Sequence, residues 1–413
     1  MSMNLRRVLP IMIGLTGLSG PASADVITDW NEKAVAFVTK HRMLPPQAER
    51  VMASVHIAMF DAVNAIERRY RPYRVTLGAA KDTSKEAAAA VAAGSVLAGL
   101  HPKDAEELNS LMDAYLASIP QGTTKSEGIK LGQEVAARIV ADRKADGADA
   151  ADAYRPKTKP GVYVPTPITA SSMWPNVKPF VMTSPSQFRP QPPIALTGAE
   201  WAADYNEIRD LGGRNSTKRT ARQTEDAQFW LVTGPASYYP IARQLVVAKN
   251  MDVIDSARFM ALAATAVADT FIAVFDAKYH YDFWRPITAI RNGDMDDNAA
   301  TERDATWQPI DNTPMHPEYP CAHCISSAGI AAVIEGVLGS ADIPEVSMTS
   351  PTAPGVTHRW TNVWAYAEEV AMARIYAGFH YRFSTRVGQD MGRKIGQLTV
   401  QTLMQKTNMA ENR

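Results

Sequence analysis

Five basic side chains that stand in apolar stretches constrain the fold of this 413-residue chain more than any other feature. Lys278 and Arg285 flank a run of four aromatic residues, His280 and Asp282, Arg374 and His380 flank Ile-Tyr-Ala-Gly-Phe, and His323 precedes an apolar helical pattern. A charge in an apolar setting needs an anionic partner, because an unpaired buried charge is costly. We therefore expect a fold that brings these side chains to one anion pocket.

This set of side chains suits a tetrahedral or trigonal bipyramidal oxyanion. Guanidinium forks and an ammonium neutralise the equatorial oxygens, while one imidazole nitrogen bonds the central atom. Phosphate and vanadate both fit that description. Lys plus Arg and Asp plus Glu number 43 each, so no global field favours nucleic acid and anion binding must be local.

The order and spacing of these residues resemble the three-part signature of the vanadium-dependent haloperoxidases and the type 2 phosphatidic acid phosphatase superfamily. That signature reads Lys-x6-Arg-Pro, Pro-Ser-Gly-His and Arg-x5-His. The corresponding segments here are Lys278 to Arg285-Pro286, Pro320-Cys321-Ala322-His323, and Arg374 to His380. The middle segment departs from the pattern, since Cys and Ala replace Ser and Gly.

The resemblance implies a role for each residue of the signature. His380 would bond vanadium, or attack phosphorus in a phosphatase. Lys278, Arg285 and Arg374 would bind oxyanion oxygens, and His323 would be the acid-base residue opposite His380. Lys278 would also act in catalysis, by polarising bound peroxide together with His323. The backbone N–H of Ala322, near a helix start, would point at the anion.

Cys321 takes the place of the family's serine, and its state has two interpretations. A reduced thiol would face the oxyanion as a weak donor. A disulfide to Cys324 is also plausible, because cysteines three apart at a helix start approach bridging distance and the chain reads as exported. We expect the free thiol. A two-Cys zinc site is the weaker reading.

His316 stands seven residues before His323. The related haloperoxidases carry a Phe or a His near the presumed halide position, and the His variant resembles the bromoperoxidase type. A structural histidine in a loop beside Pro317 is an equally good interpretation.

The predicted fold class is all-α, a large helical bundle of the haloperoxidase and acid phosphatase type. Sustained β-alternation, a repeat of 20 to 50 residues and a Gly-rich phosphate loop are all missing from the sequence. Helical patterns run over 29–68 with a break at 44–46, and over 84–100, 105–119, 125–146, 197–211, 216–230, 255–277 and 325–337. His56 and Asp61 in the first of these read as satisfied polar residues of a buried helix.

We predict four segments along the chain. They are a signal peptide at 1–24, an N-terminal helical bundle at 25–150, a Pro-rich ordered loop at 151–196 and a haloperoxidase- or phosphatase-like helical domain with the oxyanion site at 197–413. The loop is expected to be ordered because aromatic residues accompany its prolines.

The signal peptide is predicted from Arg6-Arg7, an apolar run from Val8 to Leu18, and Ala22-Ser23-Ala24. Paired arginines leave Sec and twin-arginine export both open. Later stretches do not reach 18 uninterrupted apolar residues, so stable membrane insertion is not expected. We expect a periplasmic or secreted protein, and the sequence does not indicate an oligomeric state.

Three functions follow from the resemblance and the residues. The first is an exported vanadate-dependent haloperoxidase that oxidises halide with hydrogen peroxide, bromide rather than chloride, and passes the halogen to an organic acceptor. The second is an exported acid phosphatase that cleaves a phosphate ester through a phosphohistidine at the same site. The third is a non-catalytic protein that binds phosphate or vanadate.

Overall fold

The computed structural model describes residues 25–165 and 167–407, and the predicted signal peptide lies outside them. Its regular structure is almost entirely helical, which confirms the predicted fold class. The elements are α1 Val26–Lys40, α2 Pro45–Glu67, α3 Lys85–Leu100, α4 Ala105–Ala117, α5 Thr123–Arg143, α6 Ala199–Gly212, α7 Ala221–Phe229, α8 Tyr239–Ala248, α9 Val253–Tyr281, α10 Pro286–Arg291, α11 Ala322–Leu338, β1 Asp342–Ser350, β2 Ala353–Asn362, α12 Val363–Tyr376 and α13 Arg382–Thr402.

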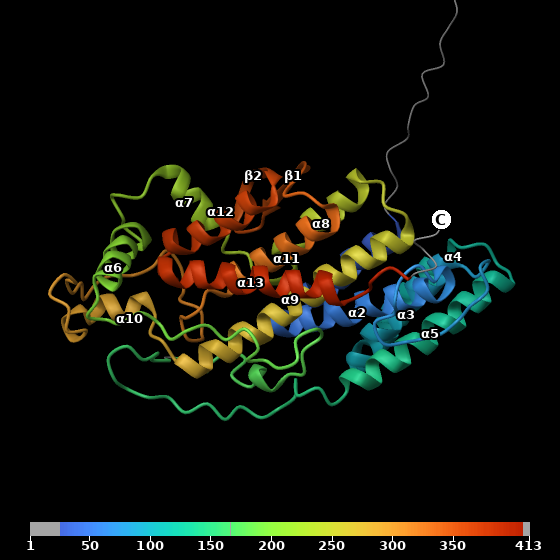
Figure 1. Cartoon of the computed structure of the whole chain (residues 1–413), viewed down its shortest axis with the longest axis horizontal. Coiled ribbons are helices and arrows are strands. Elements are labelled where there is room, and N and C mark those ends of the chain that lie inside the picture. The colour runs from blue at the N-terminus through green and yellow to red at the C-terminus, as the bar shows by residue number, and fades with distance from the viewer. Residues whose placement is uncertain (1–24, 166, 408–413) are drawn as a thin grey trace, which may run out of the picture.

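The long helix α9 runs through the middle of the molecule, and α2, α11 and α13 pack around it (Figure 1). Asp252 caps its N-terminus by accepting from the backbone N–H of Asp255. By length and hydropathy α9 meets the criteria for a membrane span, but its most apolar 18-residue window is 100% buried inside the protein. It is therefore explained as a core helix. The expected helix over 255–277 is confirmed and extends to Tyr281, which places Lys278 in its last turn.

Helices α3, α4 and α5 lie together at one end of the molecule, and α6 and α10 lie at the other (Figure 1). Ser84 caps α3, whose alanines are buried against α2 and α5. His56 bonds Asn31 at 2.8 Å, and Asp61 accepts three backbone N–H groups from residues 73–75. Both side chains are thus structural, as expected.

The Pro-rich segment 151–196 is fastened along α9. Asp269 accepts from the backbone N–H groups of Phe180, Val181 and Met182 at 2.7 to 2.8 Å. Farther along α9, Asp276 accepts two bonds from Arg189. These contacts explain how a segment with little regular structure stays packed on the helix that carries Lys278.

Two helix starts can be compared with the helical patterns expected from the sequence. Thr220 and Gln223 form a complete capping box at the start of α7, in the segment where a helix was expected. The helix expected over 197–211 corresponds to α6, which starts two residues later at Ala199, and Gly198 occupies the N-cap position without a side-chain bond.

The hairpin β1–β2 was not expected from the sequence. Its strands pair antiparallel with a register shift between Asp342 and Val346, and β1 packs on α8. Pro344, Pro354 and Gly355 interrupt the pattern, and these residue types are depleted in strands. Asn362 then ends β2 and caps α12 by accepting from Trp364 and Ala365.

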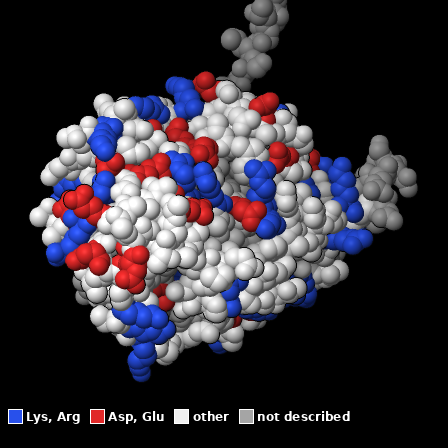
Figure 2. Space-filling view, turned by 60° about the vertical axis from the view of Figure 1, so that its left-hand side comes forward, with Lys and Arg blue, Asp and Glu red and all other residues white. Residues whose placement is uncertain are grey.

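Acidic and basic side chains are interspersed over the face of the molecule shown in Figure 2. This mixing agrees with the equal totals of 43 acidic and 43 basic residues. On this face no large surface of one sign would attract a polyanion.

Candidate active site

A cavity of about 270 Å³ lies where α9, α11 and α12 meet the loops that precede α2 and α11. Four of its lining side chains are basic, namely His316, His323, Arg374 and His380, and one, Asp311, is acidic. Apolar rings form much of the remaining wall, namely Phe271, Phe275 and Phe379. The fold therefore brings side chains from segments far apart in the sequence to one small space.

His380 follows the sharp turn that ends α12. The helix stops at Tyr376, and Gly378 adopts a φ of 79° against Gly212 of α6. A Cβ on Gly378 would lie 2.5 Å from the carbonyl oxygen of Gly212, so both the conformation and the space require glycine. This turn explains how Arg374 and His380, six residues apart in the sequence, reach the same cavity.

The imidazole of His380 is held in one orientation by Glu318. Nδ1 of His380 lies 2.8 Å from Oε1 of Glu318, and both side chains are buried. A carboxylate can only accept, so Nδ1 carries the proton and Nε2 keeps its lone pair. Burial, with Arg285 and Lys278, holds the pKa of His380 well below its usual range. A neutral imidazole whose Nε2 carries a lone pair is the form that bonds a metal centre, and in this structure that nitrogen accepts from Arg285.

Glu318 was not singled out from the sequence, although it is central to the site. It also accepts from the backbone N–H of Tyr381 at 3.1 Å. Burial raises its pKa to about 7, against the opposing effect of Lys278 and Arg285. The one available signal was its position: a carboxylate among prolines and aromatic residues between His316 and His323.

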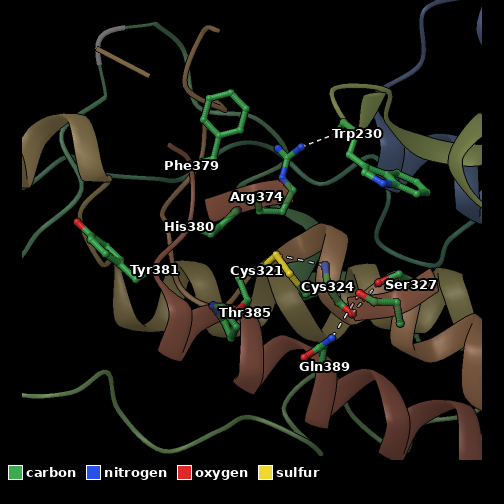
Figure 3. The surroundings of a disulfide bond; sticks show 12 residues. Trp230, Cys321, Cys324, Ser327, Arg374, Phe379, His380, Tyr381, Thr385 and Gln389 are labelled. Atoms are coloured by element: carbon green, nitrogen blue, oxygen red, sulfur yellow. Dashed lines mark hydrogen bonds between the residues drawn. A yellow bond between two sulfur atoms is a disulfide. The ribbon is translucent and has the colours of Figure 1, made fainter. Parts of the chain in front are cut away.

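Arg374 is the guanidinium most open to a ligand. Nη1 donates to the carbonyl oxygen of Trp230 at 2.6 Å, as Figure 3 shows, and the group lies 4.8 Å from the ring centre of Phe379. Nε is buried and has no hydrogen-bond partner within residues 25–165 and 167–407. Burial lowers the pKa of Arg374 to about 9, so the group stays cationic at neutral pH. An orphaned cationic donor at a cavity wall fits an anion.

Arg285 links His316 to the turn before His380. Its Nε donates to the carbonyl oxygen of His316 at 2.8 Å, and Nη1 donates to that of Phe379 at 3.0 Å. Nη2 lies 2.9 Å from Nδ1 of His316, which accepts the bond because a guanidinium only donates. Nη1 is also 3.3 Å from Nε2 of His380. Arg285 thereby places a positive charge beside the nitrogen that would bond the oxyanion's central atom.

Lys278 reaches the same region but does not line the cavity. Its ammonium donates to the carbonyl oxygens of Pro317, Glu318 and Pro320, the first two at 2.9 and 2.7 Å. These three bonds use all the protons of an ammonium group. Burial, with Arg285, holds the pKa of Lys278 well below its usual range. In this arrangement Lys278 shapes the loop before α11, and its direct contact with an oxyanion stays a prediction.

His323 lies in the first turn of α11 and faces the cavity next to Ala322. Nε2 is 3.1 Å from the carbonyl oxygen of Val232, so this nitrogen carries the proton and Nδ1 keeps its lone pair. Burial, with Arg374, holds the pKa of His323 well below its usual range. The backbone N–H groups of Ala322 and His323 lack acceptors within the helix, as the first N–H groups of every helix do.

Cys321 and Cys324 are joined by a disulfide with their Cα atoms 5.3 Å apart (Figure 3). The expectation of a free thiol at Cys321 is wrong. At the start of α11 the two side chains meet, and Sγ of Cys321 accepts from the N–H of Cys324. A disulfide has no S–H, and Cys321 does not line the cavity. Donors for an anion at this helix start would therefore have to be backbone N–H groups.

Comparison of the sequence with known proteins gives two findings. The family described as the vanadium chloroperoxidase second helical-bundle domain matches residues 258–409. The vanadium chloroperoxidase of Curvularia inaequalis is 26% identical over 277 residues, which are 51% of this chain and 45% of the relative. The chain thus spans less than half the length of that relative.

Solved structures of two bacterial proteins share the fold. A vanadium-dependent iodoperoxidase superposes with a TM-score of 0.80 at 24% identity, over 94% of this chain and 99% of that chain. An apo-type vanadium-dependent chloroperoxidase superposes with a TM-score of 0.71 at 17% identity, over 87% and 94%. The resemblance predicted from the motifs agrees with these matches: residues 258–409 match the vanadium chloroperoxidase second helical-bundle domain, and the chain shares its helical fold with the two bacterial proteins.

Proposed function

We propose that this chain is a vanadate-dependent haloperoxidase that oxidises halide with hydrogen peroxide. One observation carries the proposal: Glu318 fixes the proton of His380 on Nδ1 and leaves a lone pair on Nε2, and His380 lines the same cavity as Arg374, whose buried Nε has no partner in the described part of the chain. A nitrogen ligand beside cationic donors suits an oxyanion whose central atom accepts a bond.

The charges of the site fit vanadate. Arg285 and Arg374 are buried guanidinium groups, and Glu318 is the carboxylate bonded to His380. A bound anion would offset the positive charge that Glu318 leaves unneutralised. The backbone N–H groups at the start of α11 add donors without adding charge. His380 and Arg374 would hold the vanadate, with Arg285 next to His380.

Vanadate supplies Lewis-acid activation of hydrogen peroxide for attack by halide, with no change in the oxidation state of vanadium. The protein's part is to move protons and exclude water. His323 holds its proton at Nε2 through Val232, so Nδ1 can take a proton from peroxide and return it to the departing oxygen. Its lowered pKa keeps this nitrogen unprotonated at neutral pH.

Halide would approach along the apolar wall. Phe275 lies 5.2 Å from the ring centre of His316, whose Nδ1 faces Arg285. A weakly hydrated halide enters such a wall more readily than a strongly hydrated one, and bromide is also easier to oxidise than chloride. Bromide is therefore the preferred substrate over chloride, and organic acceptors would take the halogen at or beyond the cavity mouth.

The protein is proposed to act outside the cytoplasm, in the periplasm or after secretion. The segment at 1–24 supports this location by its sequence pattern, and the disulfide Cys321–Cys324 suits an oxidising compartment.

The test is a pair of assays on one metal-free preparation, with and without added orthovanadate. Halide oxidation is measured with hydrogen peroxide and iodide, bromide or chloride, and ester hydrolysis with a chromogenic phosphate monoester. We expect bromide oxidation that requires orthovanadate and exceeds chloride oxidation. Hydrolysis of the ester without vanadate, together with no halide oxidation, would overturn the proposal in favour of a phosphatase.

A further inference from the structure

A second cluster of metal-ligating side chains lies outside the cavity, where α7, β2 and α12 come together (Figure 1). Glu225 and Asp226 of α7 and His358 of β2 each point a ligand atom to a common point, with all three atoms within 4.8 Å of one another. Nε2 of His358 is 3.7 Å from Oε1 of Glu225 and 3.9 Å from Oδ1 of Asp226.

His358 is oriented as a metal ligand would be. Its side chain is 1% exposed, and its ring stacks on Phe229 with centres 3.9 Å apart. Nδ1 lies 2.6 Å from Oε1 of Glu369, which fixes the proton on Nδ1. Nε2 is buried and has no hydrogen-bond partner in the described part of the chain. A carboxylate behind a histidine, with the far nitrogen unpaired, is the usual support of a zinc-binding imidazole.

The separations suit a small divalent cation. Tetrahedral ligands at zinc–ligand distances of about 2.0 to 2.2 Å lie about 3.4 Å from one another. The separations of 3.7 and 3.9 Å from Nε2 need a closure of only a few tenths of an ångström. They are also too long for hydrogen bonds from Nε2 to either carboxylate. One nitrogen and two carboxylate oxygens favour Zn²⁺ over the hard cations Ca²⁺ and Mg²⁺, which take oxygen ligands.

We propose that Glu225, Asp226 and His358 bind a divalent zinc-type cation, with Glu369 as the positioning residue of His358. Water would complete the coordination. Arg222 is the competing cation at this site, because Nη1 is 3.1 Å from Oε1 of Glu225 and Nε is 2.8 Å from Oδ1 of Asp226. Its side chain is 60% exposed, so it can move into solvent when a metal binds.

The zinc site would brace the wall of the oxyanion cavity. Glu369, which positions His358, also accepts from the indole N–H of Trp230 at 3.0 Å. The carbonyl oxygen of Trp230 in turn accepts from Arg374. A cation bound to His358 would therefore restrain the C-terminal end of α7. The residue that follows this helix, Trp230, holds Arg374 through its carbonyl oxygen. This inference does not depend on the proposed haloperoxidase activity, because its test measures zinc binding.

The experiment is a calorimetric titration of Zn²⁺ into tag-free, chelator-treated, full-length protein, with thermal unfolding followed in parallel. We expect one site per chain in the wild type and a higher Tm with zinc. His358→Gln, which can still bond Glu369, should bind zinc at least about tenfold more weakly, since one of three ligands is lost. Glu225→Gln and Asp226→Asn, on the more exposed α7, should also weaken binding.

Two further variants test whether zinc binds at this site rather than at another histidine, and whether the cluster is a metal site rather than a set of ion pairs. Arg222→Gln should bind zinc more tightly than the wild type, because the competing cation is gone. His380→Ala should bind zinc as the wild type does. The proposal is overturned if the wild type binds no stoichiometric zinc, or if binding survives unchanged in His358→Gln and in the two α7 variants.

Discussion

At the scale of single residues, the hydrogen bond from His380 to Glu318 determines which nitrogen of the imidazole is available. Removing the negative charge of Glu318 weakens both the preference for the Nδ1–H tautomer and the basicity of Nε2. The chemistry assigned to His380 thus depends on a side chain that need not touch the oxyanion itself.

Glu318→Gln should therefore lower the affinity for orthovanadate by about 10- to 100-fold, the usual cost of losing a partner behind a metal ligand. The measurement is an orthovanadate titration of the metal-free protein. Glu335→Gln, on α11 away from the cavity, is the matched control and should bind as the wild type does. Equal affinities of Glu318→Gln and the wild type would show that the carboxylate has no part in the site.

Sequence reasoning at this scale identified the residues but not all of their contacts. The predicted basic residues do converge on one region, namely Lys278, Arg285, His323, Arg374 and His380. They could be predicted because a charged residue within an apolar segment is buried with that segment and then needs a partner. The state of Cys321 and the bonding of Lys278 to three carbonyl oxygens depend on the local backbone path before α11, which residue types do not reveal.

At the scale of elements, the close packing of α11 on α13 sets the position of the helix start that carries Ala322 and His323. Gly388, Gly392 and Gly396 recur every four residues along α13 and face the backbone of α11. A Cβ added at Gly392 would lie 2.0 Å from the carbonyl oxygen of Ile325. The contact is to backbone, so only separation of the two helices could relieve it.

Gly392→Ala is expected to lower the free energy of unfolding by about 1–3 kcal/mol or more through overpacking. Helix propensity alone would favour alanine by about 1 kcal/mol, so the sign of the effect tests the packing. Urea unfolding gives the measurement, with Gln397→Ala on the exposed side of α13 as control. A stabilised Gly392→Ala variant would show that the helices are not in the close contact described.

Helices were predictable because their apolar periodicity and caps are local. The α7 capping box, the apolar run of α9 and the end of α12 at a glycine all stand in the sequence. The β1–β2 hairpin was missed because Pro344 and Pro354-Gly355 hide its alternation, and its pairing is fixed by packing on α8 rather than by strand propensity.

At the scale of the whole molecule, the buried core contains carboxyl groups that affect stability across the pH range. Glu49 of α2 is buried and accepts from the hydroxyl of Tyr239 at 2.9 Å. Burial raises its pKa from 4.5 to about 8. The folded protein therefore holds this proton more tightly than the unfolded chain does, and its contribution to stability falls as pH rises from about 4.5 to about 8.

Glu49→Gln stays neutral and does not show this loss. The free energy of unfolding of Glu49→Gln minus that of the wild type should therefore increase by roughly 1–4 kcal/mol between pH 5 and pH 8.5. Urea unfolding of both proteins at the two pH values provides the comparison, and the shared contributions of Asp61 and Asp269 cancel in the difference. A difference that does not change with pH would mean that Glu49 titrates normally.

The central claim is that the whole fold converges on one oxyanion site at His380. Its most direct test is the amount of vanadium retained per chain after metal-free protein is equilibrated with orthovanadate and dialysed, in the wild type and in His380→Ala. We predict one vanadium per wild-type chain, displaced by millimolar phosphate, and none in folded His380→Ala. Equal retention by the two proteins, or retention that phosphate does not reduce, would contradict the account.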